Sequence, residues 1–413
     1  MRLVLISCVL IATTGAGVPA QSTAPAQSIP QSGGTVTLRA ARIFDGASTQ
    51  LLRGSVVTVT NGRITSVGPA EGANIIDLGD VTLMPGMIDV HTHIDWHFGA
   101  DGLYGTRPGS PAETPEQRTA AVAANMKATL LAGFTTIQNL GNRGDAALRT
   151  AVNDGTMVGP RVVTSLGQLS PRTSTPEQLR EAVRASKAAG ADVIKTFASG
   201  SIRDGGKLNV TQEQLDAICH EAKAQGLRAV VHAHDPASII AAVKAGCSQI
   251  EHGVFADDAA IAAMKAANVF FDPNIGLVLQ NYIENKAKFL GTGSYTEEGF
   301  AFMEKAVPTL GPIFKKALDA GLRMPLGTDA VAGAHGQNAR EAIARVAAGQ
   351  RPVDALISAT SLAAVSLGMG DTIGRLAPGY AADIIAVSGD PTTDIKTLRS
   401  VRFVMAQGRI VLK

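Results

Sequence analysis

Residues 84–97 read MPGMIDVHTHIDWH, and residues 116–133 read EQRTAAVAANMKATLLAG. The first stretch contains an apolar run of strand length, and the second is an alanine-rich run of helix length that ends at a glycine. A buried strand followed by a helix is the repeating unit of α/β folds. Three of the chain's eight histidines lie in or just after this strand. The stretch therefore predicts a fold class and also marks a candidate site.

The same alternation of β-branched and alanine-rich runs continues from about residue 85 to residue 369. The predicted strands, in chain order, are MIDVHTH, FTTIQNL, RVVTSL, DVIKTFAS, RAVVHAH, CSQIEHG, VFFDPNI and RMPLGTDA. Eight strand–helix units are the count of a (β/α)8 TIM barrel, for which ~250 residues is typical. An open doubly wound sheet is disfavoured because no glycine-rich phosphate fingerprint follows the first strand. We therefore expect residues 86–369 to form a (β/α)8 barrel catalytic domain.

The two ends of the chain have a different hydrophobicity pattern from the middle. Residues 35–85 and 370–413 contain short segments of alternating hydrophobicity, with turn signals at Asp45-Gly46, Asn61-Gly62 and Gln407-Gly408. Strand-rich pieces at both ends can pair with each other. They predict a small β-sandwich domain built from both termini.

The first 34 residues lack the pattern of a folded domain. One arginine, an apolar run over residues 3–12 and small residues up to Ala20 predict a signal peptide over residues 1–20. The apolar run is shorter than the ~20 residues of a membrane-spanning helix. Residues 21–34 are rich in Ser, Pro, Gln and Gly, which is typical of a linker. We expect an exported protein, periplasmic or secreted, with no membrane attachment after removal of the signal.

Charge and cysteine content limit the partners. The formal net charge is +2, and no basic stripe with interleaved aromatic residues is present, so we expect no binding to nucleic acid. Export leaves Cys219 and Cys247, which either pair in an oxidising compartment or remain two buried thiols.

Ionisable residues lie at the ends of five of the eight predicted strands. In a barrel these ends meet at one face, where active sites form. Such a cluster would be costly to bury unless a bound group compensated it, and imidazole and carboxylate ligands suit Zn, Mn, Fe or Co. Strand periodicity alone cannot choose between His232 and His234. The residues are His91, His93, Lys195, His232, His234, Glu251, His252 and Asp329.

Lys195 is unusual in this set because a protonated amine would repel metal cations and is costly to desolvate. It must therefore be neutral or modified.

These motifs, taken in order, resemble those of the amidohydrolase superfamily. The resemblance rests on HTH in MPGMIDVHTH, the lysine of the fourth strand, VVHAH, IEHG, GTDA and the closing phrase GRLAPGYAADIIAV. It implies that Lys195 is carboxylated to a carbamate that bridges two divalent metal ions, most often Zn. It also implies that His91 and His93 with Asp329 hold one ion, and that His232 and His252 hold the other.

Within the superfamily, the chain is most similar to the prolidase-like dipeptidase and carboxypeptidase group, which is related to imidazolonepropionase-like amidohydrolases and ochratoxin-type amidases. The resemblance implies a binuclear metal-dependent hydrolase that cleaves dipeptides or N-acyl amino acids by attack of a metal-bridging hydroxide. Asp329 would be the catalytic proton carrier. The expected substrate contacts are His234, Arg203, Tyr104 and His335, and we expect a homo-oligomer. Arg203 either pairs with a substrate carboxylate or is a solvated loop charge.

Two other functions are compatible with these motifs. A cyclic amide hydrolase of the imidazolonepropionase kind would use the same metals. A non-catalytic periplasmic metal-binding protein would need two lobes and a hinge, whereas the sequence predicts one barrel with a fused β domain.

Overall fold

The structure is a computed structural model that describes residues 34–69, 75–105 and 112–412. The predicted signal peptide and all of the predicted linker except Gly34 lie outside these ranges. Across the described part of the chain, no helix is both long enough and apolar enough to cross a membrane.

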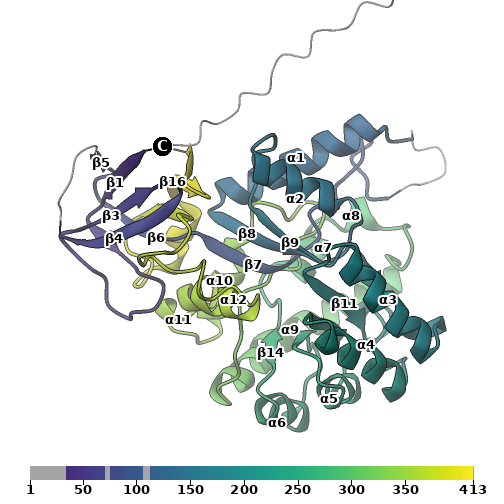
Figure 1. Cartoon of the computed structure of the whole chain (residues 1–413). Helices are drawn as coiled ribbons and strands as arrows, with labels where there is room; N and C mark the ends of the chain where they lie inside the picture. Colours follow the sequence, from purple (N-terminus) through teal and green to yellow (C-terminus); the bar gives the residue numbers. More distant parts are fainter. Residues whose placement is uncertain (1–33, 70–74, 106–111, 413) are drawn as a thin grey trace, which may run out of the picture.

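Parallel strands form the centre of the molecule (Figure 1). They lie in two sheets, of order β7-β8-β9 and β10-β11-β12-β13-β14, and every pairing within them is parallel. The strands are β7 (Met87–Thr92), β8 (Phe134–Asn139), β9 (Arg161–Thr164), β10 (Gln168–Leu169), β11 (Val193–Phe197), β12 (Arg228–Ala233), β13 (Gln249–His252) and β14 (Phe270–Asp272). Parallel sheets of this kind are buried on both faces, which explains the continuous apolar runs in the sequence.

Helices follow the strands and surround them (Figure 1). Three of these helices begin with a capping box, at Thr114, Thr175 and Thr211, where the threonine side chain and a glutamine three residues later satisfy free backbone N–H groups. The helices are α1 (Pro115–Leu131), α2 (Asp145–Asp154), α3 (Pro176–Ala188), α4 (Gln212–Ala224), α5 (Pro236–Lys244), α6 (Asp258–Ala266), α7 (Val278–Glu284), α8 (Lys286–Phe289), α9 (Glu297–Asp319), α10 (Ala339–Ala347), α11 (Pro352–Ser358) and α12 (Ser361–Ser366). The predicted α/β alternation is confirmed.

The two parallel sheets are linked by hydrogen bonds at both edges. The Asp192 N–H donates to the Thr164 carbonyl at 2.8 Å, which connects β9 with the start of β11. On the other side, residues 323–330 lie between β14 and β7: the Phe271 N–H donates to the Arg323 carbonyl, and the His93 N–H donates to the Ala330 carbonyl.

Residues 323–330, which we expected to form the eighth strand, are not a regular strand. Only single bridges, at Arg323 and Ala330, connect them with their neighbours. Pro325 has no N–H to donate, and Asp329 has a positive φ of 52°, so an unbroken ladder cannot form.

Both ends of the chain contribute to a second pair of sheets, seen at the left of Figure 1. One has the order β4-β3-β1-β5 and the other β17-β16-β15-β6-β2, in which β6 pairs with β15 from the far end of the sequence. Leu38, Val57, Leu83, Ile384 and Phe403 belong to one apolar cluster that draws on both sheets. The strands are β1 (Thr35–Arg39), β2 (Arg42–Ile43), β3 (Ser55–Thr60), β4 (Arg63–Pro69), β5 (Ile75–Asp77), β6 (Val81–Pro85), β15 (Ile384–Ser388), β16 (Val401–Ala406) and β17 (Arg409–Leu412).

Two of the three predicted turns are confirmed as tight hairpins. Asn61-Gly62 joins β3 to β4 and Gln407-Gly408 joins β16 to β17, with positive φ at all four residues. Asp45-Gly46 also lies in a turn, with a positive φ at Gly46, but it is not a two-residue hairpin, because Ile43 pairs with Leu52 across a longer loop. There the Asp45 carboxylate accepts hydrogen bonds from the backbone N–H groups of residues 47 and 48.

Cys219 and Cys247 form a disulfide, with their Cα atoms 5.1 Å apart. Cys219 lies on α4, and Cys247 lies just before β13. Of the two alternatives left open by the sequence, the structure has the paired form.

Candidate active site and metal centre

The end of β7 places two imidazoles on one face. His91 and His93 are two residues apart, so their side chains point the same way, and both are buried. The Nδ1 atom of His91 lies 2.8 Å from Oε2 of Glu251 on β13. If Nδ1 carries the proton of that hydrogen bond, Nε2 presents its lone pair to the centre of the site.

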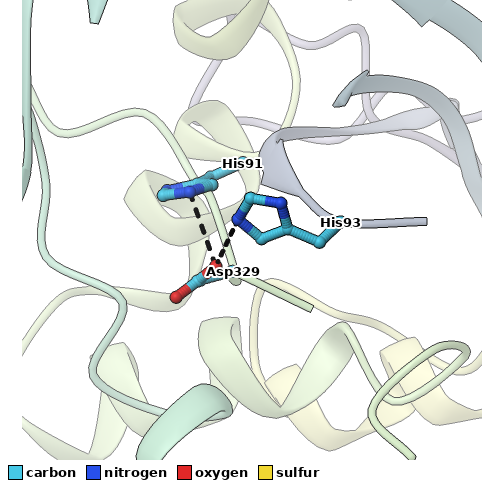
Figure 2. A group of neighbouring side chains, drawn as sticks. All are labelled: His91, His93 and Asp329. Carbon is cyan, nitrogen blue, oxygen red and sulfur yellow. Dashed lines mark ion pairs between the residues drawn. The ribbon is translucent and has the colours of Figure 1, made fainter. Parts of the chain in front are cut away.

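Asp329 faces both histidines. Its Oδ1 lies 3.4 Å from Nε2 of His91 and 3.2 Å from Nε2 of His93 (Figure 2). One ligand atom from each of these three residues falls within 4.8 Å of the others, so the group can hold a metal ion. Although burial opposes the charge, the neighbouring His91 and His93 lower the pKa of Asp329 to about 2. Asp329 is therefore a carboxylate at neutral pH.

The segment that carries Asp329 is held by three consecutive backbone hydrogen bonds. The Gly327 N–H donates to Asp272 at 2.9 Å, the Thr328 N–H to Asp89 at 3.0 Å, and the Asp329 N–H to the His91 carbonyl at 2.8 Å. The positive φ of Asp329 costs ~1–3 kcal/mol and persists because these bonds fix it. Carboxylates from β14 and β7 thus replace the ladder partners that a regular strand would use.

Lys195 on β11 is buried beside these groups. Its Nζ lies 3.3 Å from Nε2 of His91. Within the described residues, no carboxylate oxygen lies within 4.0 Å of this nitrogen. Burial lowers the pKa of Lys195, although nearby Glu251 and Asp329 oppose that effect. Burial thus opposes the charged form of this amine.

His232, His234 and His252 complete a ring of imidazoles. The ring centroids of His232 and His252 are 4.7 Å apart, and those of His91 and His252 are 5.2 Å apart. Nε2 of His232 lies 3.1 Å from the Gly200 carbonyl, which can only accept, so this nitrogen carries a proton and leaves Nδ1 free. Burial holds the pKa values of His91, His232 and His252 well below their usual range.

This donor set fits divalent metal ions. Neutral imidazoles and an ionised carboxylate are the forms in which these side chains bind metals, and a fixed tautomer is typical of metal-binding histidine. A second observation supports a metal site: the buried Nδ1 of His93 has no hydrogen-bond partner among the described residues. All six predicted metal ligands line one cavity of about 260 Å³: His91, His93, Lys195, His232, His252 and Asp329.

The predicted substrate contacts divide into two groups. His234 and Arg203 line the same cavity as the metal ligands. Tyr104 lies one layer behind, with its ring 5.3 Å from that of Trp96, which lines the cavity. His335 points elsewhere: its Nε2 bonds to the Trp96 carbonyl at 3.0 Å, and it lines a different hollow beside α1. The geometry therefore gives no support to His335 as a substrate contact.

Three buried carboxylates support the site: the sequence predicted Glu251 only as a member of the ionisable cluster, and it did not single out Asp89 or Asp272. Asp89 and Asp272 hold the segment of Asp329, and Glu251 orients His91. The signal that could have found them is an acidic residue inside an otherwise apolar strand, in MIDVHTH, VFFDPNI and CSQIEHG. Such a residue is too costly to bury without a partner.

Comparisons with known proteins show the family of the chain. The profile of the amidohydrolase family matches residues 82–411. Ochratoxinase of Aspergillus niger is 30% identical over 365 residues, which cover 78% of this chain and 73% of that protein. Imidazolonepropionase of Anaeromyxobacter sp. (strain K) is 25% identical over 384 residues, covering 81% and 84%. A solved structure of a Xaa-Pro dipeptidase with bound methionine in the active site has a TM-score of 0.83 at 27% identity, over 92% of this chain and 100% of that one.

Proposed function

The chain belongs to the amidohydrolase family and is a hydrolase of C–N bonds, and we propose that it is a binuclear metal-dependent enzyme that cleaves dipeptides or N-acyl amino acids. The observation that carries this proposal is the convergence of His91, His93 and Asp329 beside a buried Lys195. Because the chain is an enzyme, the non-catalytic binding protein is set aside.

For the metals, we propose two sites. His91, His93 and Asp329 would hold one ion and His232 and His252 the other, with a carboxylated Lys195 between them. Zn suits this ligand set. When bound, two such ions activate water and polarise a carbonyl. The support for carboxylation is that burial favours the uncharged amine of Lys195, the form that reacts with carbon dioxide, and that the product is an anion where a bare ammonium would repel cations.

Asp329 is suited to carry the proton. It is ionised at neutral pH and lies against the imidazoles rather than against a permanent cation, so it can accept a proton and release it. Amide cleavage needs this transfer because an unprotonated amide nitrogen leaves poorly. The cavity volume, about 260 Å³, lies just below the ~300–1,000 Å³ range of small-molecule sites and suits a short substrate.

For the fold, we infer a closed TIM barrel with a terminal β sandwich. The support is that residues 323–330 bond to β14 on one side and β7 on the other, and that one apolar cluster draws on both terminal sheets. A closed barrel of this kind would bring the six proposed ligands to one mouth.

The proposal is tested by two measurements on one preparation. Elemental analysis should give two divalent ions per chain, and a panel of dipeptides and N-acyl amino acids should include substrates whose hydrolysis stops on chelation and returns with Zn²⁺. A panel of cyclic amides, run beside it, examines the imidazolonepropionase-like alternative. Fewer than two ions in fully active protein would refute the binuclear site, and turnover of cyclic amides alone would refute the substrate class.

A further inference from the structure

Arg203 is held rigidly at the wall of the active cavity. It lies in the short helix η2 (Ile202–Asp204), in the loop after the strand of Lys195. Its Nε donates to Oγ of Ser294 at 2.9 Å, and its guanidinium carbon lies 4.1 Å from the centre of the Tyr295 ring and 5.6 Å from that of Tyr282. Stacking on aromatic faces and one hydrogen bond fix the plane of the guanidinium.

Arg203 forms no ion pair with any residue that the structure describes. Among the residues that the structure describes, no carboxylate oxygen lies within 4.0 Å of the Arg203 nitrogens, and Nη1 and Nη2 have no hydrogen-bond partner. Arg203 is mostly buried and lines the cavity together with Asp329. Burial of an unpaired charge is costly, so the free edge of the guanidinium is the part to which an anion would bind.

His234 is a second unsatisfied group in the same wall. The residue is 3% exposed, and in the part of the chain that the structure describes neither of its ring nitrogens has a hydrogen-bond partner. The loop that carries Arg203 packs directly on it at Gly206, where a Cβ would lie 2.8 Å from the Cβ of His234. This glycine also has a positive φ of 66°, so the close approach depends on the absence of a side chain.

We propose that Arg203 and His234 form the subsite for a free carboxylate of the substrate, at the end that leaves as an amino acid. The inference rests on the proposed amide hydrolysis and names the group that the enzyme requires on its substrate. Nη1 and Nη2 donate two parallel hydrogen bonds to the two carboxylate oxygens, and His234 donates one more from the side. A carboxamide has only one acceptor oxygen and a donor nitrogen, so it cannot accept both guanidinium hydrogen bonds.

Part of the cavity wall is apolar. Phe197, Ile202, Val254, Leu279 and Leu310 line the cavity, together with the uncharged polar residues Gln168, Ser201 and Asn274. In such surroundings a charged hydrogen bond is stronger than in water, and its loss leaves one ion without a partner. Removal of Arg203 should therefore affect carboxylate substrates far more than neutral ones.

The test compares matched ligands that differ only in this group. Hydrolysis of glycyl-L-phenylalanine and of glycyl-L-phenylalaninamide is followed by release of glycine, and binding of L-phenylalanine and L-phenylalaninamide is measured by calorimetry. The wild type should favour both free acids. Arg203→Met should weaken kcat/KM and affinity for the free acids by about 10²-fold, while the values for the amides change by less than about 3-fold. Arg203→Lys keeps the charge but lacks the two parallel N–H donors of a guanidinium, so its kcat/KM and affinity for the free acids should lie between those of the wild type and of Arg203→Met.

The controls separate this inference from the proposed function. Arg172→Met removes an exposed arginine and should change neither ligand series. A thermal melt and the retained amide values show whether Arg203→Met is folded. If the wild type hydrolyses no dipeptide or N-acyl amino acid at all, the proposed function fails, and the binding of L-phenylalanine and L-phenylalaninamide by calorimetry still decides the subsite. If acids and amides bind the wild type equally, or if Arg203→Met keeps the full preference for the acids, the subsite is refuted.

Discussion

Gly327, which lies two residues before Asp329, donates its backbone N–H to Oδ1 of Asp272 at 2.9 Å. A Cβ at position 327 would overlap the Asp272 carboxylate, so the bond requires glycine. The position of a proposed metal ligand thus depends on a close contact between a loop and the end of the neighbouring strand.

We predict that Gly327→Ala lowers activity and metal content together. The added methyl group must push Asp272 or the loop aside, which moves Asp329 away from His91 and His93. A displacement of about 1 Å at a catalytic group lowers the rate by about 10²-fold. Metal analysis and kcat/KM measure the effect. Gly311→Ala is the matched control, because nothing lies within 4 Å of a Cβ there, and it should leave both values unchanged.

Arg345 supports the same contact from α10. It is fully buried and donates to Asp272 at 3.1 Å, to Glu341 at 2.9 Å and to the carbonyls of Met324 and Pro325. We predict that Arg345→Met lowers the free energy of unfolding by ~3–5 kcal/mol, because it leaves two carboxylates buried without their cation. Urea denaturation measures the change.

Arg351→Met provides the comparison for this loss of stability. Arg351 pairs with Asp354 on an exposed face, where an ion pair contributes ~0–1 kcal/mol. Equal effects of the two substitutions would contradict the role given to Arg345.

For Lys195, we predict that replacement by Ala removes metal and activity in parallel, and that acetate restores part of both by occupying the vacated position. The control is Lys223→Ala, an exposed lysine on α4. A fully active Lys195→Ala protein would exclude the carbamate.

For export, we predict that the mature protein begins at Gln21 and contains no free thiol, because Cys219 and Cys247 are paired. N-terminal sequencing of the exported fraction and thiol titration before and after reduction check both points. Soluble cytoplasmic protein that retains residues 1–20 would contradict this prediction.

The sequence predicted those parts of the molecule that depend on local patterns. Strand–helix alternation gave the α/β architecture, and the two-residue spacing of His91 and His93 gave their common face. Two turns were predicted correctly because Asn-Gly and Gln-Gly adopt the positive φ angles of a tight hairpin, a preference that does not depend on the rest of the fold.

Features that depend on contacts between distant residues were not predictable in this way. In the sequence, nothing around Arg345 distinguishes it from an arginine on the exposed face of a helix. It is nevertheless buried, because it pairs with Asp272 and Glu341. The irregular path of residues 323–330 follows from side-chain partners on β7 and β14. The place of His335 also depended on how a loop folds back onto the Trp96 carbonyl.

The assignment of Asp329 as both ligand and proton carrier can be tested by one substitution. Asparagine keeps the size of the side chain and one oxygen that can face His91 and His93, but it cannot carry a proton. Asp329→Asn should therefore retain much of the metal and lose ~10² to 10⁴ in kcat, the range of general acid–base catalysis. Asp319→Asn, at an exposed pair with Lys315, should have no such effect. If Asp329→Asn binds both metals and cleaves its best substrate within a few-fold of wild type, another group carries the proton, and His234, buried in the same wall with two unpartnered nitrogens, is the next residue to replace.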